Sequence, residues 1–539
     1  MKKTAILSLL LALILSFSAC GSVGITESAE SVSTAGTSDM FTDRDLEIGY
    51  DEATSALITL SGDGASCNSD AVQISGSTVT ITDEGTYVLS GTLNDGMIVV
   101  NAEDTDKIQL VLNQVSITSS TSAAIYVLEA DKVFITTAAG TENTLANGGE
   151  YIAIDDNNID AVIFSKSDLT LNGAGTLTIN AAAGHGIVSK DDLVLSSGAY
   201  VITAASHGIS GKDSVRIASG TYAIVSGKDG IHAENTDDTS LGYLYVAGGT
   251  FEITAEGDGL SASAYLQIDN GDFTIATGGG SASVTLTAST IHSGKAGGFQ
   301  TQTATTETDS VSQKGIKADG AITLSGGNYA MNTADDSIHA GGDILITGGT
   351  YNLQSGDDAI HSDAAVVIRS GAFTISYCYE GIEGLSVTVD DGTFDIVSVD
   401  DGINSAGGAD SSGFGGARFG QEQFSASSDS FITINGGTFV IVSTGDCLDS
   451  NGALTINGGT LNLTCNGSGN TAIDCDGTYT NNGGNVTTND GSERNLGQMG
   501  RGAGTQNGMG GQGSMGTQGG TGVQNQRGTP DQRGQVPGT

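Results

Sequence analysis

A 22-residue repeat is the feature that most constrains how this chain can fold. From about residue 160 onward, each repeat has a Gly-Thr-aromatic turn, an alternating apolar and polar stretch, an acidic pair or Gly, and then Ile or Leu. The aliphatic positions are Ile187, Ile209, Ile231, Leu260, Ile316, Ile338, Ile360, Ile382, Ile403, Leu448 and Ile473. Most neighbours in this series are 21 or 22 residues apart, and insertions separate the others.

Alternation between Gly-rich turns is typical of short β-strands. One repeat cannot bury its apolar face alone, so repeats must stack at the spacing of paired strands, about 4.8 Å, and share one core. We therefore predict an all-β protein that folds as a right-handed, single-stranded parallel β-helix, a solenoid with about 22 residues per coil.

Composition agrees with this fold and excludes several functions. The 539 residues include 82 Gly but only 2 Pro and no Trp, which suits many strands joined by tight turns. The formal net charge of −43 repels nucleic acid, so we expect no nucleic-acid partner. The absence of Trp also excludes a flat, Trp-lined cellulose-binding surface.

The first residues indicate export. Lys2 and Lys3 precede an apolar run that ends in Ser18-Ala19-Cys20-Gly21, the layout of a bacterial lipoprotein signal. We predict a signal peptide over 1–20 with Cys20 lipidated, a flexible Ser/Thr-rich linker over 21–50, the β-helix over 51–490 and a disordered Gly/Gln/Met-rich tail over 491–539. The protein would then be an extracellular, cell-surface lipoprotein that touches the bacterial membrane only through its lipid. Ordinary cleavage near Cys20 is the alternative.

Cysteines do not form a disulfide framework. Five remain beyond Cys20, so at least one thiol is unpaired, while one disulfide among Cys447, Cys465 and Cys475 stays open. We expect a monomer.

An aromatic residue recurs in each repeat, two positions before an aliphatic residue of the same strand. The series is Tyr200, Tyr222, Phe251, Phe273, Tyr329, Tyr351, Phe373, Phe394 and Phe439. Strand alternation places both residues on the inner face, so we predict an aromatic stack inside the core rather than an external sugar platform.

Acidic residues form a second series, two positions before each aliphatic residue. This acid ladder reads His185, His207, Asp229, Asp258, Lys314, Asp336, Asp358, Glu380, Asp401 and Asp446. Like charges about 5 Å apart repel by roughly 1 kcal/mol in water and more at lower dielectric, so counter-cations are needed. Crowded carboxylates favour Ca²⁺ over Zn²⁺ or Mg²⁺. The predicted calcium ligands are Asp335, Asp336, Asp357, Asp358, Glu380, Asp400 and Asp401. A merely solvated face with Asp-Gly turns is the alternative.

A third series follows each aliphatic residue by one position. This outer ladder contains His232, Lys317, His339, His361, Glu383 and Asn404, followed by Asp449. Its mixture of donors and acceptors suits a polar groove for a glycan, and the first six are our predicted carbohydrate contacts. Insertions over 278–313 and 407–429 belong to loops, which often lie on the binding side of a solenoid.

Several units carry a family resemblance: "KDGIHAE", "KGIKADG", "DDSIHA", "DDAIHSD", "YEGIEG" and "DDGINSAGG". They resemble the carbohydrate-binding domain-containing proteins over about 57–489. The resemblance implies a secreted, often lipid-anchored bacterial protein with a pectate-lyase-like right-handed parallel β-helix. It also implies calcium and binding of cell-wall polysaccharides such as cellulose and polygalacturonate, without established catalysis. In this interpretation 51–490 is the carbohydrate-binding domain.

The leading hypothesis is therefore a surface-anchored, calcium-stabilised, non-catalytic protein that binds pectin, cellulose or an envelope glycan. One alternative is a calcium-dependent pectate-type lyase, for which Lys314 and Lys317 are the only bases we nominate. A glycoside hydrolase with two carboxylates and a non-enzymatic adhesin also remain open.

Overall fold

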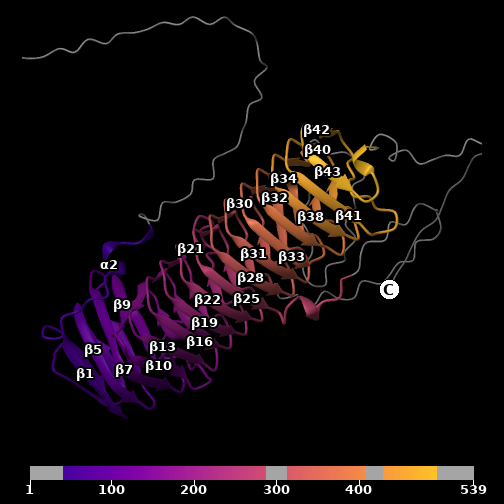
Figure 1. Cartoon of the computed structure of the whole chain (residues 1–539). Coiled ribbons are helices and arrows are strands. Elements are labelled where there is room, and N and C mark those ends of the chain that lie inside the picture. The colour runs from indigo at the N-terminus through magenta and orange to yellow at the C-terminus, as the bar shows by residue number, and fades with distance from the viewer. Residues whose placement is uncertain (1–39, 287–311, 407–428, 495–539) are drawn as a thin grey trace, which may run out of the picture. The chain divides into compact units, whose positions relative to one another are not determined.

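The computed structural model describes residues 40–286, 312–406 and 429–494. Figure 1 shows successive coils of the β-helix following one another from β1 at the N-terminal end to β43. The predicted signal peptide, Cys20, most of the linker, most of both insertions and the tail from 495 lie outside the described residues.

Each coil contributes strands to three stacked sheets, which we number 1 to 3 in chain order within a coil. Sheet 1 contains β4 (Thr78–Ile81), β6 (Met97–Asn101), β8 (Ile125–Glu129), β11 (Ala161–Ser165), β14 (His185–Ser189), β17 (Ile209–Gly211), β20 (Ile231–Ala233), β23 (Leu260–Ala262), β26 (Ile316–Ala318), β29 (Ile338–Ala340), β32 (Ile360–Ile368), β34 (Ile382–Val389), β36 (Ile403–Ser405) and β39 (Leu448–Ser450).

Sheet 2 contains β9 (Lys132–Thr137), β12 (Asp168–Gly173), β15 (Asp192–Leu195), β18 (Ser214–Ile217), β21 (Tyr243–Val246), β24 (Leu266–Ile268), β27 (Ile322–Leu324), β30 (Ile344–Ile346), the second halves of β32 and β34, β37 (Phe431–Ile434), β40 (Ala453–Ile456) and β42 (Tyr479–Asn481).

Sheet 3 contains β10 (Glu142–Asn147), β13 (Thr176–Ala181), β16 (Ala199–Ala204), β19 (Thr221–Ser226), β22 (Thr250–Ala255), β25 (Asp272–Thr277), β28 (Asn328–Thr333), β31 (Thr350–Ser355), β33 (Ala372–Tyr377), β35 (Thr393–Val397), β38 (Thr438–Ser443), β41 (Thr460–Cys465) and β43 (Asn485–Thr488). Near the N-terminal end, β1 (Ala56–Gly62), β5 (Gly85–Leu93) and β7 (Lys107–Ser119) are longer strands that lead into sheets 2 and 3.

Stacking is parallel and in register through the repeats, which confirms the predicted parallel β-helix. Ile316 pairs with Ile338, Ile338 with Ile360, and Ile360 with Ile382, and the same series continues to Ile403 and Leu448. These aliphatic side chains are fully buried. A residue type that recurs every coil therefore becomes a physical row along the stack.

The predicted aromatic stack is confirmed. Its nine rings lie face to face inside the core, with centroids 4.5 to 5.2 Å apart and interplanar angles of 9° or less. Each tyrosine hydroxyl donates to the backbone carbonyl three residues earlier, as Tyr351 does to Gly348 at 2.9 Å. The rings therefore fill the core while their polar tips are satisfied at the preceding turn.

Two antiparallel hairpins cover the N-terminal end of the stack. The strand β2 (Ala65–Cys67) pairs with β1, and β3 (Val72–Ser75) pairs with β4. Because these additions are short, the edge they leave is short as well.

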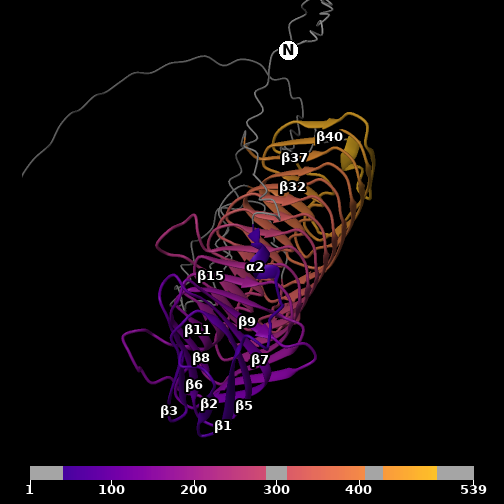
Figure 2. The same ribbon diagram turned by 90° about the vertical axis from the view of Figure 1, so that its left-hand side faces the viewer.

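The C-terminal part of the predicted flexible linker differs from expectation. Residues Asp43–Leu46 form the short helix α2, which Figures 1 and 2 show beside the N-terminal coils. Asp45 is buried there, pairing with Lys132 at 2.8 Å and accepting a hydrogen bond from Thr170 at 2.6 Å. This paired carboxylate, together with hydrogen bonds from Asn172 and Ser196 to the Asp45 carbonyl, fixes the segment against the solenoid, which the Ser/Thr-rich composition did not reveal.

The remaining elements are two short 3-10 helices, Ser281–Ser283 and Ser492–Arg494. Within the described ranges, no helix has the length and apolarity needed to span a bilayer. The five cysteines described are all free thiols, so Cys447, Cys465 and Cys475 form no disulfide with one another, and Cys378, Cys447 and Cys465 are buried.

Candidate functional site

The acid ladder lies in the turns that lead from sheet 3 into sheet 1, and its carboxylates are structural acceptors. Oδ1 of Asp336 accepts the backbone N–H of Asp358 at 2.9 Å, and Oδ1 of Asp358 accepts that of Glu380 at the same distance. The pattern repeats between Asp401 and Asp446 at 2.6 Å. Asp336, Asp358 and Asp401 therefore each hold the turn of the following coil. Asp336, Asp358 and Glu380 are buried, so this row is not a solvated acidic face.

The outer ladder is also a physical row, because His339 pairs in register with Lys317 and His361, and His361 with Glu383. Its side chains lean back onto the acid ladder: His339 Nδ1 lies 2.9 Å from Asp336 Oδ2. Side-chain exposure is 28% for Lys317, 17% for His232 and Glu383, and 14% for His339, whereas His361 is 1% exposed. Asn404 is likewise buried. An arriving ligand would meet the first four rather than His361 or Asn404.

A lysine neutralises the middle of the acid ladder. The Lys314 ammonium lies 2.9 Å from Asp335 and 2.7 Å from Asp336, and all three side chains are buried. Burial alone would lower the pKa of Lys314, but Asp336 and Asp335 raise it above its usual value. This ammonium is an internal counter-cation and is not free to accept a proton. We call Lys314, Asp335, Asp336 and His339 the lysine segment.

The second nominated base, Lys317, is placed differently. Its ammonium pairs with Asp319 at 3.4 Å, at the surface of β26. Lys317 is thus the more accessible of the two, since Lys314 donates to two buried aspartates.

His361 is surrounded by carboxylates. Its Nδ1 lies 3.1 Å from Asp358 and 2.9 Å from Glu383, and its Nε2 lies 3.4 Å from Asp363. Burial would lower its pKa, but Asp358, Asp363 and Glu383 raise it, so the ring is held as an imidazolium. A second internal cation therefore follows the lysine segment along the stack.

Beyond His361, carboxylates from successive coils lie close enough to repel one another. We call Glu380, Asp400, Asp401, Asp446, Asp449 and Asp474 the acid segment. Burial raises the pKa of Glu380, and Glu383 and Asp358 raise it further. Burial also raises the pKa of Asp401, with Asp449 and Asp400 adding to it, and that of Asp446 to about 8. Each of these carboxylates is destabilised as an anion.

The acid segment fits a hard cation. Ligand oxygens of Asp446, Asp449 and Asp474 lie within 4.8 Å of one another. Asn404 donates Nδ2 to Glu380 at 2.9 Å, while its buried Oδ1 has no hydrogen-bond partner within the described residues. Carboxylate and amide oxygens in a crowded, adaptable set are the ligands that Ca²⁺ prefers. Asp335, Asp336 and Asp357 also lie within 4.8 Å of one another, but Lys314 already supplies their positive charge.

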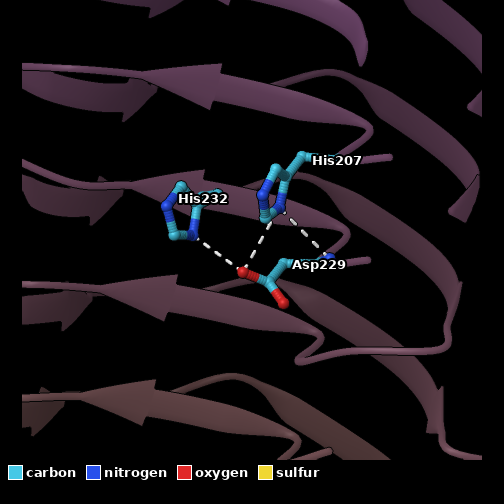
Figure 3. Close-up of side chains that lie close together, drawn as sticks. All are labelled: His207, Asp229 and His232. Atoms are coloured by element: carbon cyan, nitrogen blue, oxygen red, sulfur yellow. Dashed lines mark hydrogen bonds and ion pairs between the residues drawn. The ribbon is translucent and has the colours of Figure 1, made fainter. Parts of the chain in front are cut away.

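At the N-terminal end of the ladder, imidazoles replace most of the acids. His185, His207 and His232 stack with centroids 5.0 and 4.3 Å apart, and Asp229 lies against the second and third rings (Figure 3). Burial first, and then neighbouring His207 and Lys190, lower the pKa of His185 to about 3, so this ring is neutral. We call His207, Asp229, His232 and Glu234 the histidine segment.

Sequence reasoning placed His207 and Asp229 in the acid ladder and His232 in the outer ladder but missed their convergence; it placed Asp449 in the outer ladder without counting it as a metal ligand, and it missed Asp474. The ladder pattern contains the signal for Asp449, which follows Leu448 as Asn404 follows Ile403. Asp474 follows Ile473, which makes only an isolated bridge to Leu448, so the irregular last coil hides it.

The stacked parallel coils and the ladders of ionisable side chains define this molecule as a parallel β-helix protein with a polar ladder. The chain belongs to the family of carbohydrate-binding domain-containing proteins, whose model matches residues 75–359 and 357–520. The predicted family resemblance is thus confirmed.

Two further likenesses cover parts of the chain. A carbohydrate-binding domain-containing protein of Acetivibrio thermocellus is 41% identical over 133 residues, which is 24% of this chain and 46% of that relative. The chain thus spans about half the length of that relative. A solved polysaccharide lyase-like protein from C. thermocellum, a gadolinium derivative, is 37% identical and covers 42% of this chain and 92% of its own, with a TM-score of 0.41.

Proposed function

We propose that this protein is a cell-surface polysaccharide-binding protein that calcium stabilises and that has no catalytic activity. The family membership over 75–359 and 357–520 is the observation that carries the carbohydrate-binding role. The lipoprotein-like sequence around Cys20 supports attachment to the outer side of a bacterial membrane.

The calcium part of the proposal rests on the acid segment. Ligand oxygens of Asp446, Asp449 and Asp474 lie within 4.8 Å of one another, and the buried Oδ1 of Asn404 has no hydrogen-bond partner within the described residues. Calcium at this place would relieve repulsion that otherwise destabilises the last coils.

Non-catalysis is supported by the state of the nominated bases. A lyase base must accept a proton at the substrate, but the buried Lys314 ammonium bridges two aspartates and its pKa is raised. Lys317 is more accessible, and it can instead donate a hydrogen bond to a glycan hydroxyl or pair with a uronate.

The glycan-binding test uses the protein without its first 20 residues. Binding to polygalacturonate and to insoluble cellulose is measured with Ca²⁺ and with EGTA, while ultraviolet absorbance follows the unsaturated uronide that a lyase would release. We expect saturable binding to at least one glycan and flat absorbance. The Lys317→Met variant should bind more weakly, and Lys212→Met, an exposed lysine in the turn between β17 and β18, serves as its control. Rising absorbance would instead establish a lyase.

The calcium test compares the melting temperatures of the parent protein and of one variant, each measured with Ca²⁺ and with EGTA. Asp401→Asn removes a crowded negative charge but keeps an oxygen for the backbone N–H of Asp446. We expect it to raise the melting temperature in EGTA and to reduce the gain that Ca²⁺ gives. At a free concentration of 100 Kd, one site stabilises the native protein by about 2.7 kcal/mol. An identical melting curve with Ca²⁺ and EGTA in the parent protein would overturn the calcium assignment.

A further inference from the structure

We propose that His207, Asp229 and His232 form a second, chemically distinct metal site that takes a nitrogen-preferring divalent ion such as Zn²⁺. This site is independent of the calcium proposal, because it lies at the other end of the acid ladder and uses imidazole rather than only oxygen. One ligand atom from each residue lies within 4.8 Å of the others.

Three possible ligand atoms converge at this point, namely His207 Nδ1, His232 Nδ1 and Asp229 Oδ2. His207 Nδ1 accepts the backbone N–H of Asp229 at 3.2 Å, so its lone pair already points toward this turn. His232 Nδ1 lies 2.7 Å and His207 Nδ1 3.3 Å from the same oxygen, Asp229 Oδ2 (Figure 3). The other carboxylate oxygen, Asp229 Oδ1, is committed to the backbone N–H of Asp258 at 2.8 Å.

His232 provides a second observation that points to a ligand. Its Nδ1 is buried and, although it lies close to Asp229 Oδ2, it makes no aligned hydrogen bond with any described residue. Its other nitrogen, Nε2, lies 3.4 Å from Glu234. Glu234 at the far nitrogen orients the ring, and a metal would displace the proton that His232 Nδ1 shares with Asp229 Oδ2, which makes the near lone pair a ligand.

The distances suit a small tetrahedral ion. With zinc–nitrogen and zinc–oxygen bonds of about 2.0 to 2.2 Å, tetrahedral ligand atoms lie about 3.4 Å apart. The His207 to Asp229 separation of 3.3 Å already matches this value, and the His232 contact of 2.7 Å has to open by about 0.7 Å. His207 must also release its long bond to the Asp229 backbone. Since the side chains are 14 to 17% exposed, water can reach a fourth position.

Ligand chemistry separates this site from the acid segment. Two imidazoles and one carboxylate favour Zn²⁺, Co²⁺, Ni²⁺ or Cu²⁺, whereas Ca²⁺ and Mg²⁺ prefer oxygen alone. His339 and His361 do not form an equivalent site. Lys314 already pairs with Asp336, the aspartate beside His339. Among the described residues, three carboxylates and no second imidazole ligand surround His361.

The test measures Zn²⁺ binding to the chelator-treated full chain by calorimetry in excess Ca²⁺, so that oxygen sites are already filled. Co²⁺ then serves as a spectroscopic probe. We expect one tight site and the visible bands of four-coordinate Co²⁺ with nitrogen ligands. His232→Gln and Asp229→Asn should each weaken Zn²⁺ binding by at least about 100-fold, and Glu234→Gln by about 10-fold, because it only positions His232.

His339→Gln is the matched control, because His339 also lies in the outer ladder with Nδ1 2.9 Å from an aspartate. It should leave Zn²⁺ affinity unchanged. Asp229→Asn keeps an Oδ1 acceptor for Asp258, so it tests the site even if a histidine variant folds poorly. Zinc affinity that is absent in the parent protein, or equal in the parent and in Asp229→Asn, would overturn the proposal. The Ca²⁺-dependent melting shift is independent of either result.

Discussion

At the scale of single residues, Lys314 is the clearest example of a charge that the fold itself supplies. Its ammonium is 8% exposed between Asp335 and Asp336, which are 3% and 0% exposed. Removing one partner of a buried ion pair leaves an uncompensated charge and typically costs about 3 to 5 kcal/mol. We expect Lys314→Met to lower the free energy of unfolding by that amount in denaturant titrations with EGTA.

Two comparisons isolate the charge from the lost packing. Lys317→Met removes an exposed pair and should cost less than about 1 kcal/mol. Adding Ca²⁺ should restore part of the loss in Lys314→Met, since Asp335, Asp336 and Asp357 then present three carboxylates within 4.8 Å. Equal stability of Lys314→Met and the parent protein would show that the two aspartates do not need this ammonium.

At the scale of elements, the aromatic stack shows how a residue type that recurs in the sequence contributes to the free energy of unfolding. Phe373 is 2% exposed and stacks between Tyr351 and Phe394 at 4.6 and 4.8 Å. Phe373→Ala should cost about 3 to 5 kcal/mol by cavity formation. Tyr351→Phe keeps the ring and loses only the hydrogen bond to Gly348, so about 1 kcal/mol is expected. Similar losses for both variants in denaturant titrations would contradict stacking as the main contribution.

The helix α2 offers a pH test at the same scale. Burial would raise the pKa of Asp45, but Lys132, Thr170 and Thr42 lower it from 3.8 to about 2. The depressed value means that its stabilisation, about 2 kcal/mol, is present above pH 4 and is lost as the pH falls through 2. Hydrogen exchange of the α2 amides, corrected for intrinsic rates, should therefore accelerate in acid.

In the variant Asp45→Asn, α2 should be destabilised at neutral pH as it is in the parent protein when acid protonates Asp45. Tryptic cleavage after Arg44 should become about 30-fold faster, which corresponds to the same 2 kcal/mol. Glu47→Gln, which removes only the exposed contact of Arg44, is the control and should leave the rate unchanged. Cleavage of Asp45→Asn at the parental rate would show that other contacts hold this segment.

The repeat made the strands predictable from the sequence. The burial and hydrogen bonding of the ladder side chains could not be predicted in this way. A period of 22 and strand alternation were sufficient to predict the parallel stacking of Ile338 on Ile360 and the inward rings. The burial of Asp336 and Asp358 was missed because it depends on backbone N–H groups one coil away. The anchoring of Asp45 was also missed, since its partners Lys132 and Thr170 are 87 and 125 residues distant and share no pattern with it.

At the scale of the whole β-helix unit, one ladder position is neutralised in different ways along the stack. Imidazoles occupy the N-terminal end of the ladder, the Lys314 ammonium and the His361 imidazolium neutralise its middle, and the acid segment is where we propose that calcium binds. The ladder carboxylates Asp336, Asp358 and Asp401 lie in the turns that lead into sheet 1, where each accepts a backbone N–H of the next coil. A change of counter-ion therefore alters the stability of neighbouring coils directly.

The ends of the stack impose the last requirement, because a solenoid without caps exposes strand edges that can pair with other chains. Here β2 and β3 cover β1 and β4 by antiparallel pairing. Deleting residues 1–83 removes these hairpins and uncovers β5 and β6, so we expect concentration-dependent association in light scattering. Deleting only residues 1–39 keeps both hairpins and α2 and should not change the scattering. If the two truncated proteins scatter alike, the hairpins do not act as caps and the edge of β5 is protected by its own twist and side chains.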